Sequence, residues 1–347
     1  MIGQEDREGS LEYLENLCDI ASAEKSLAPL KEKFSSFNIS DEDQVDMILK
    51  AAIQKDIQQI LSSQTLERAK HYVKRLRNSI ASFSGSPSQG ININLWKGYD
   101  HILTGSLWNI GPRVSNSSHK AWYWGNFVPQ IPFQLISRYT APGDWVLDPF
   151  CGSGTTIVEA TKLGRNSLGI ELNPDVIVRT DELLASIRES NGVRALTELG
   201  NSLSYDYASF VAGQRINGFK LAILHPPYWD IIRFSENKDD LSTSSDLEDF
   251  TGRLATLVKA FLPSMTKGGH VGLVIGDMYR NGEIIPLGFR TMEAVLGLGL
   301  KLRGIIVKDI QNTRAKRTSE NLWRYRALKS GFYVFKHEYV FVFRVPE

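Results

Sequence analysis

The sequence predicts an α/β protein in which a helical N-terminal region precedes a mostly parallel sheet. Two observations lead to this prediction. From about Trp145 onward, short apolar runs alternate with stretches suited to helices, which is the pattern of βαβ units. Before that point, apolar residues recur at helical spacing. A chain of 347 residues is long enough for one large domain and a smaller appendage.

Two helices are expected in the N-terminal region. Apolar residues recur every three or four positions from Val45 to Leu61 and from Leu66 to Phe83. The second helix either packs in a hairpin or on the main domain, or it forms a dimer seam or faces DNA. The segment Ser82 to Gly90, S-F-S-G-S-P-S-Q-G, has the composition of a linker. We therefore expect a helical region over 1–84, a linker and lead-in segment over 85–121, and the main domain over 122–347.

Buried strands of the main domain are expected at five apolar runs, 144–150, 166–172, 220–225, 270–276 and 302–307. The last run, from His337, can add an antiparallel strand to the sheet. One more strand is needed between the second and third runs, and only Ala195 to Tyr205 has room for it.

Composition narrows the class of protein. The chain has no apolar run of about 18 residues that could span a bilayer, and its first residues are charged rather than apolar. Its two cysteines, Cys18 and Cys151, lie far apart, so neither a disulfide framework nor a thiolate zinc site is indicated. We expect a cytoplasmic protein with no metal and no membrane partner.

One segment is strongly basic although the net charge of the chain is only +1. Between Gln311 and Lys336, seven basic residues stand against the single acid Glu320, and the aromatic residues among them include Trp323, Tyr325, Phe332 and Tyr333. Basic side chains neutralise phosphates and aromatic rings stack on bases, so this segment is either a nucleic-acid surface or a solvated basic loop.

A glycine-rich turn is the sharpest local motif, L-D-P-F-C-G-S-G-T-T from Leu147 to Thr156. A P-loop would need Gly-Lys-Ser/Thr after the turn, and Thr155 and Thr156 stand there. A dinucleotide site would need a small residue where Ile157 stands. An S-adenosylmethionine site needs a close turn and a carboxylate for the ribose at the end of the next strand, which Glu171 provides.

The run A-I-L-H-P-P-Y-W-D, Ala222 to Asp230, ends a buried strand in an unusual way. Prolines stiffen the chain and fix the directions of its carbonyls. Fixed acceptors at His225 and Pro226 would suit an exocyclic amine, and Tyr228 and Trp229 offer faces for a base flipped out of a duplex. The alternatives are a stiff turn followed by two core aromatics.

These motifs together resemble the DNA amino-methyltransferases, which modify adenine at N6 or cytosine at N4. D-P-F-C-G-S-G-T-T is similar to the cofactor loop of this family, and P-P-Y-W to its catalytic motif. The segment 127–144 resembles the lead-in to the cofactor loop, and G-D-M at 276 and H-E-Y at 337 also have counterparts. The likeness covers about Trp122 to Arg344.

The resemblance implies a Rossmann-like methyltransferase fold, a seven-stranded sheet with one antiparallel strand, and S-adenosylmethionine as methyl donor. It also implies direct transfer of the methyl group without a covalent enzyme intermediate. Carried over by position, the residues for the methionine part are Phe127, Pro129, Asp148, Phe150, Gly152, Gly154 and Thr155. Glu171 binds the ribose, Leu172 packs on the adenine, and the catalytic residues are His225, Pro226, Pro227 and Tyr228.

The sequence departs from the family at two positions. His225 stands where the family has Asp, Asn or Ser, and Asn201 stands where it often has an acid that binds the cofactor adenine. A neutral imidazole accepts one hydrogen bond and a protonated one accepts none, so we expect activity to fall below about pH 6.5.

DNA is the expected partner, together with a cognate restriction or defence-system protein, and the chain is expected to be a monomer or a homodimer. P-P-Y-W-D favours cytosine N4, while adenine N6 stays open. RNA as substrate stays open too, as does a catalytically weak regulatory protein that binds the cofactor. Trp229 is expected to contact the base, and Arg314, Lys316 and Arg317 the phosphates.

Overall fold

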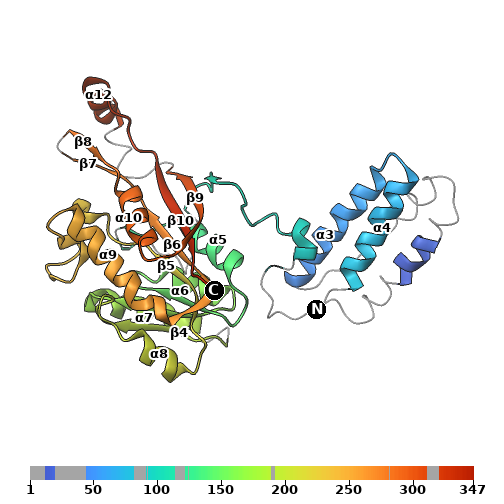
Figure 1. Cartoon of the computed structure of the whole chain (residues 1–347), viewed down its shortest axis with the longest axis horizontal. Coiled ribbons are helices and arrows are strands. Elements are labelled where there is room, and N and C mark those ends of the chain that lie inside the picture. Colours follow the sequence, from blue (N-terminus) through green and yellow to red (C-terminus); the bar gives the residue numbers. More distant parts are fainter. Residues whose placement is uncertain are drawn as a thin grey trace. The chain divides into compact units, whose positions relative to one another are not determined.

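The computed structural model describes residues 12–19, 44–81, 91, 93–113, 122–123, 125–188, 192–280, 282–310 and 320–347. It divides the chain into two compact units, Met1–Ile102 and Leu103–Glu347 (Figure 1). The boundary falls within the segment for which the sequence predicts a linker.

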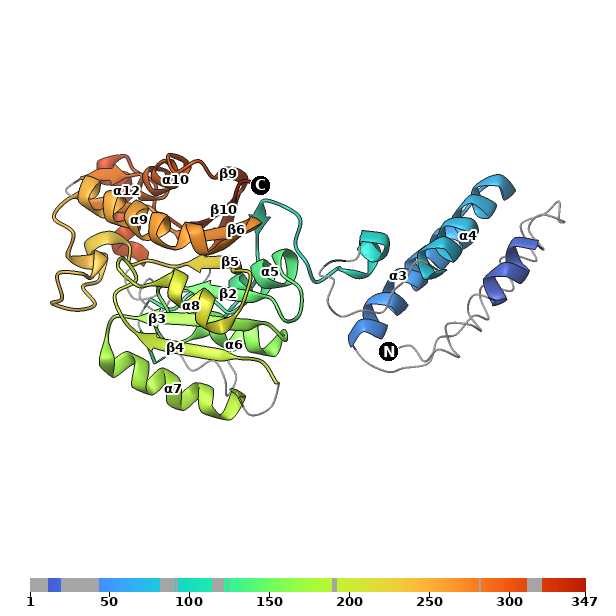
Figure 2. The ribbon, with the colours of Figure 1, turned by 60° about the horizontal axis from the view of Figure 1, so that its bottom comes forward.

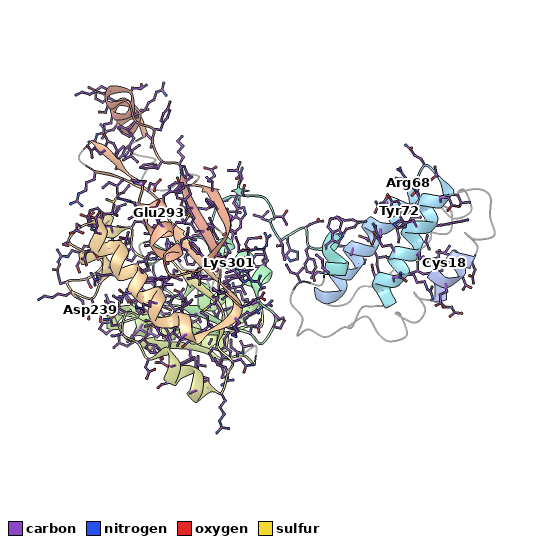
Figure 3. All side chains as sticks on the ribbon, in the orientation of Figure 1. Cys18, Arg68, Tyr72, Asp239, Glu293 and Lys301 are labelled. Carbon is purple, nitrogen blue, oxygen red and sulfur yellow. The ribbon has the colours of Figure 1, made fainter. Side chains whose placement is uncertain are left out.

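The N-terminal unit is a small helical bundle. Its helices are a segment over 12–19, α3 (Gln44–Leu61), α4 (Leu66–Ala81) and the short 3₁₀ helix η1 (Ile93–Gly98). Figure 3 labels Cys18 on the first of these and Arg68 and Tyr72 on α4. Its core is a separate cluster formed by Leu14, Leu17, Ile53, Ile60, Val73 and Leu76, among others. Both helices predicted from the apolar spacing are confirmed.

The C-terminal unit is built on an eight-stranded sheet with the order β1-β9-β10-β6-β5-β2-β3-β4. All neighbours are parallel except β10, which is antiparallel to both β6 and β9. The strands are β1 (Leu107–Trp108), β2 (Trp145–Asp148), β3 (Asn166–Glu171), β4 (Ala195–Leu199), β5 (Phe219–Leu224), β6 (Met265–Ile275), β9 (Lys301–Asp309) and β10 (His337–Arg344).

The sequence predicts seven of these eight strands, including β4 in the segment Ala195 to Tyr205. The expected number of seven is wrong by one, because β1 adds two residues beside β9. A strand of two residues is too short to produce a recognisable hydrophobic pattern in the sequence. The small hairpin of β7 (Met278–Arg280) and β8 (Glu283–Ile285) was also not predicted.

Helices cover both faces of the sheet, which explains why strands such as β2, β5 and β10 are buried along almost their whole length. One face packs on α5 (Gln130–Tyr139), α6 (Thr155–Lys162) and α7 (Pro174–Arg188), and the other on α8 (Tyr207–Gln214), α9 (Leu247–Phe261) and α10 (Leu287–Leu296). Strand β10 shows the alternation: Phe341 and Phe343 belong to the α9 side, and Val340 and Val342 to the α5 side. Figure 2 shows the sheet between these layers.

The topology brings distant residues to one edge of the sheet. The parallel strands β2, β3, β4 and β5 all end there, and β10 begins there because it runs the other way. The hairpin β7–β8 and helix α12 (Glu320–Ser330) extend from the same edge (Figure 1). Among the described residues, no helix is both long and apolar enough to cross a bilayer.

Candidate functional site

A cavity of about 370 Å³ opens at this edge, a volume typical of small-molecule sites. It lies where β2 and β5 neighbour each other and the strand order reverses, which is where open α/β sheets bind ligands. Most of the site residues predicted from the sequence line it: Phe127, Phe150, Gly152, Thr155, Glu171, Leu172, Asn201, His225, Pro226, Pro227 and Tyr228.

The glycine turn joins β2 to α6 and needs its glycines for two reasons. Gly152 and Gly154 both have left-handed backbones, with φ of 49° and 76°. A Cβ at Gly154 would also lie 2.8 Å from the methyl group of Thr180. The turn therefore keeps its shape only without side chains at these positions, and this leaves the cavity wall beside Gly152 as bare backbone.

The carboxylate of Glu171, at the end of β3, faces the cavity and also ties the turn in place. Its Oε2 accepts the N–H of Gly152 and its Oε1 accepts the N–H of Asn173, both at 2.8 Å. Burial raises the pKa of Glu171, and these backbone hydrogen bonds oppose that shift. Each oxygen keeps a second lone pair, so the carboxylate can still accept ribose hydroxyls.

Three residues expected to hold the cofactor stand behind the cavity wall instead of lining it. Pro129 is buried at the start of α5, and Gly154 caps α6. Asp148 is buried, its Oδ1 accepts the N–H of Phe150 at 3.0 Å, and burial raises its pKa to about 6. Their expected contact with the cofactor therefore stays a prediction, while the structure shows Asp148 and Gly154 as parts of the turn.

The H-P-P-Y loop follows β5 and also lines the cavity. His225 lies against the ring of Phe127, with ring centroids 4.7 Å apart, and its Nε2 is 3.4 Å from the hydroxyl of Tyr228. Burial lowers the pKa of His225 to about 4, with the charges of Glu338 and Lys308 acting in opposite directions. The imidazole is therefore neutral at pH 6.5, which argues against the loss of activity expected near that pH.

Glu338 and Lys308 are cavity residues that the sequence did not reveal. They are directly opposite each other on β10 and β9, and Nζ of Lys308 donates to Oε1 of Glu338 at 2.8 Å. Oε2 of Glu338 accepts the hydroxyl proton of Tyr228 at 2.9 Å. The signal was the H-E-Y run at 337, which marks the strand but not the side to which the acid points.

Trp229 does not line the cavity, contrary to expectation. Its backbone is left-handed, with φ of 49°, which is uncommon for an aromatic residue. This backbone conformation directs the side chain of Trp229 away from that of Tyr228. Its indole is 6% exposed, donates to the carbonyl of Ser244 at 2.9 Å and carries the guanidinium of Arg280 on its face. It is a core residue that anchors the end of the loop.

Two further aromatic residues border the cavity from outside the predicted motifs. The rings of Tyr123 and Phe234 stack with centroids 5.8 Å apart, and both line the cavity. Phe234 belongs to the segment between η2 (Trp229–Ile231) and α9, which also contributes the exposed Asp239 labelled in Figure 3. No periodicity or motif marks this segment in the sequence.

The predicted phosphate contacts Arg314, Lys316 and Arg317 lie outside the described residues. The second part of the basic segment is described and forms α12. Its cations Arg324, Arg326 and Lys329 are exposed, and Phe332 after the helix stacks on Tyr279 of β7 with centroids 4.1 Å apart. We call the hairpin β7–β8 and α12 together the projection.

The cavity fits S-adenosylmethionine, the methyl donor that the resemblance implies. Backbone without side chains at Gly152 leaves room for the methionine part, and the Glu171 carboxylate faces the same space. Asn201 also lines it, although its Oδ1 already accepts the N–H of Leu203 at 2.9 Å. These residues would hold the cofactor between the glycine turn and the H-P-P-Y loop.

Comparison with known proteins points to the same family. The family described as DNA methylase, with N6 and N4 specificities, matches residues 29–180. A Type II methyltransferase, M.MjaII of Methanocaldococcus jannaschii, is 44% identical over 52 residues, 15% of this chain and 10% of the relative. M.MthZI of Methanothermobacter thermautotrophicus is 38% identical over 82 residues, 18% of this chain and 23% of the relative.

The solved structure of TrmN from Thermus thermophilus is similar to this chain, with 17% identity and a TM-score of 0.42. The similar region covers 64% of this chain and 50% of the TrmN chain. The matched segments span less than a quarter of the two curated relatives. The sequence matches agree with the cofactor loop and the cavity, and over these segments the chain is similar to the N6/N4 DNA amino-methyltransferases, whose cofactor is S-adenosylmethionine.

Proposed function

We propose that this chain transfers a methyl group from S-adenosylmethionine to the exocyclic amino group of a base in DNA. One observation carries the proposal: the glycine turn with Glu171 and the H-P-P-Y loop line one and the same cavity. A cofactor and a planar base can therefore meet in it. The cofactor supplies an electrophilic methyl group, and the chain supplies position and hydrogen-bond acceptors.

The acceptors suit an amine that is a poor nucleophile. The lone pair of an adenine or cytosine amino group is delocalised into its ring. Hydrogen bonds from its two protons to the carbonyl of Pro226 and to the imidazole of His225 would favour a pyramidal nitrogen with a localised lone pair. Both residues line the cavity, and placement of this kind supplies much of the rate in such reactions.

The base must leave the duplex to reach these acceptors, since a stacked base cannot enter a cavity. Tyr228 is partly buried and fixed on both sides: its hydroxyl is held by Glu338, and its ring packs on Gly276, where a Cβ would lie 3.1 Å away. A fixed ring of this kind provides the stacking face for the displaced base.

The projection suits contact with the rest of the DNA. It extends from the edge at which the cavity opens, and α12 exposes three cations together with Tyr325, which is 61% exposed. Arg280 of β7 pairs with Asp230 at 2.9 Å and covers Trp229, so the projection is tied directly to the end of the H-P-P-Y loop. We assign phosphate and groove contacts to this projection.

Cytosine N4 is the favoured target, because P-P-Y-W-D is closer to that subgroup, and adenine N6 is the alternative. Incubation of the full chain with S-adenosylmethionine and unmethylated DNA, followed by mass spectrometry of the nucleosides, decides between N4-methylcytosine and N6-methyladenine. Glu171→Ala should abolish the product, and Glu182→Ala, at an exposed position on α7, should not. Detection of neither methylated base would contradict the proposal.

The same assay separates the remaining candidate functions. Methylated nucleosides from RNA but not from DNA would indicate an RNA enzyme. Binding of the cofactor in calorimetry without turnover on either nucleic acid would indicate a regulatory protein.

A further inference from the structure

Four side chains, two from strands β9 and β10 and two from the loop after β5, form a continuous series of hydrogen bonds in the cavity. Nζ of Lys308 donates to Oε1 of Glu338, the hydroxyl of Tyr228 donates to Oε2, and Nε2 of His225 lies 3.4 Å from that hydroxyl. All four residues line the cavity. His225 stands at the position that the family uses to select its substrate. The residues hydrogen-bonded in series with His225 can therefore influence the reaction.

The direction of these hydrogen bonds follows from the number of protons. The carboxylate of Glu338 has no proton, so the single hydroxyl proton of Tyr228 must point toward it. The Tyr228 oxygen can then only accept from His225, which requires a proton on Nε2. A neutral imidazole has one ring proton, so Nδ1 is left with a free lone pair.

Packing holds the members of this series in position. The ring of Phe127 lies on the imidazole, and the Lys308–Glu338 pair is almost completely buried and joins β9 directly to β10. The rings of His225 and Tyr228 meet edge to face, with an interplanar angle of 87°. As in a catalytic triad, a carboxylate fixes the tautomer of a histidine, but here it acts through the hydroxyl of Tyr228 instead of directly.

We infer that Nδ1 of His225 takes the proton that the target amine releases, and that Glu338, acting through the hydroxyl of Tyr228, is the positioning residue that fixes this tautomer. The inference rests on the proposed function for its substrate. As the amine nitrogen bonds to the methyl carbon, the carbon–sulfur bond breaks, sulfur keeps the electron pair, and the amine proton passes to Nδ1. The resulting imidazolium donates from Nε2 to Tyr228, and Glu338 compensates its charge until the proton leaves to solvent.

The tautomer can be measured without substrate or cofactor, by nitrogen NMR of the full chain labelled at its histidine rings. The His225 signals are assigned by their loss in His225→Gln. We expect His225 to carry its proton on Nε2 at pH 7.5, and to populate both tautomers in Tyr228→Phe. A proton on Nδ1 in the parent protein would overturn the inference.

A second histidine and tyrosine pair on β10 provides a matched control. Nε2 of His337 lies 3.0 Å from the hydroxyl of Tyr339, which donates to Asp277 at 3.1 Å, and none of the three lines the cavity. Tyr339→Phe should change the signals of His337 and leave those of His225 unchanged. Glu338→Gln should change His225 alone, and the double variant Lys308→Gln/Glu338→Gln repeats this test without leaving an unpaired lysine. An effect of Tyr339→Phe on His225 equal to that of Tyr228→Phe would also count against the inference.

Kinetics test the proton transfer itself. His225→Asn keeps an acceptor for the amine but cannot take its proton, so kcat should fall about 100-fold while KM for DNA changes little. An unchanged kcat in His225→Asn would refute the role of His225 as the base. If the parent chain methylates nothing, the proposed function fails. The NMR experiment still tests the tautomer of His225 independently of that outcome.

Discussion

Oε2 of Glu171 accepts the backbone N–H of Gly152 at 2.8 Å, although Glu171 is also the carboxylate that faces the cavity. Gly152 follows β2 and Glu171 is the last residue of β3, and these two strands are parallel neighbours that end at the same edge of the sheet. One carboxylate therefore both holds the shape of the glycine turn and offers acceptors to the cofactor. Its removal should disturb both functions together.

Glu171→Gln should weaken the binding of S-adenosylmethionine by about tenfold or more. The amide keeps one acceptor oxygen and replaces the other with a donor, so one hydrogen bond to a charged group disappears, at a cost of about 1.5–3 kcal/mol. Isothermal titration calorimetry measures the affinity directly. Glu182→Gln on α7 removes the same charge from an exposed position and should bind like the parent. Equal affinities of the two variants would show that Glu171 does not contact the cofactor.

Gly154→Ala should destabilise the C-terminal unit by about 1–3 kcal/mol, because alanine is strained at a φ of 76° and its Cβ would meet Thr180 at 2.8 Å. Thermal or denaturant unfolding measures the change. Gly213→Ala is the control: this glycine lies in α8 with no atom within 4 Å of the added Cβ, so its variant should be as stable as the parent or more so. Similar losses in both variants would exclude the steric explanation.

Protonation of His225 should not lower the rate of methylation between pH 8 and about pH 5.5. Burial lowers the pKa of its imidazole to about 4, so the ring stays neutral and keeps its acceptor throughout this range. A rate that falls by half near pH 6.5 would show that His225 titrates as it does in water.

The same shift has a consequence for stability with a defined sign. The folded pKa of His225 lies below the ordinary value of about 6.5, so the unfolded chain binds more protons between these two pH values. The free energy of unfolding should therefore decrease as the pH falls from 6.5 toward 4. His225→Gln should lose less stability over this interval than the parent, although His270, whose pKa burial also lowers to about 4, contributes to both. A parallel pH dependence of the two proteins would contradict this assignment.

The sequence was sufficient for the parts of the site that depend on local chain geometry. Glu171 ends a buried strand, and Gly152 and His225 follow the ends of two others. Parallel strands end at the same edge of a sheet, so the proximity of these residues follows from the order of motifs. Glu338 was not predictable in this way. Its contact with Tyr228 joins positions 110 residues apart and depends on the register of an antiparallel strand.

Trp229 shows that a sequence motif can also predict a contact that the structure does not have. In P-P-Y-W the two aromatics are adjacent, and the sequence assigns both to the base. The left-handed backbone at Trp229 separates them, so that Tyr228 lines the cavity while Trp229 packs in the core. A single dihedral angle decides this, and no propensity of tryptophan predicts it, since φ above zero is disfavoured for such a side chain.

The exposed cations of α12 should contribute to DNA affinity mainly through phosphates. The triple variant Arg324→Ala/Arg326→Ala/Lys329→Ala should weaken binding and reduce the slope of log K against log salt concentration by up to about 2.7, or about 0.9 for each phosphate that a cation no longer neutralises. Fluorescence anisotropy with a labelled duplex at several salt concentrations measures this slope. Effects that are uniform across DNA sequences would identify phosphate contacts rather than base contacts.

The control for α12 removes the same number of cations from the other end of the sheet. Lys267 and Lys301 lie near the starts of β6 and β9, and Lys259 lies in the last turn of α9; all three are exposed, and Figure 3 labels Lys301. Alanine at these three positions changes the net charge equally but should leave the salt slope almost unchanged. If both triple variants reduced the slope alike, DNA would be responding to total charge, and the projection would lose its assigned role. A decrease confined to the α12 variant would place the duplex at the edge where β5 ends, from which a flipped base reaches Tyr228.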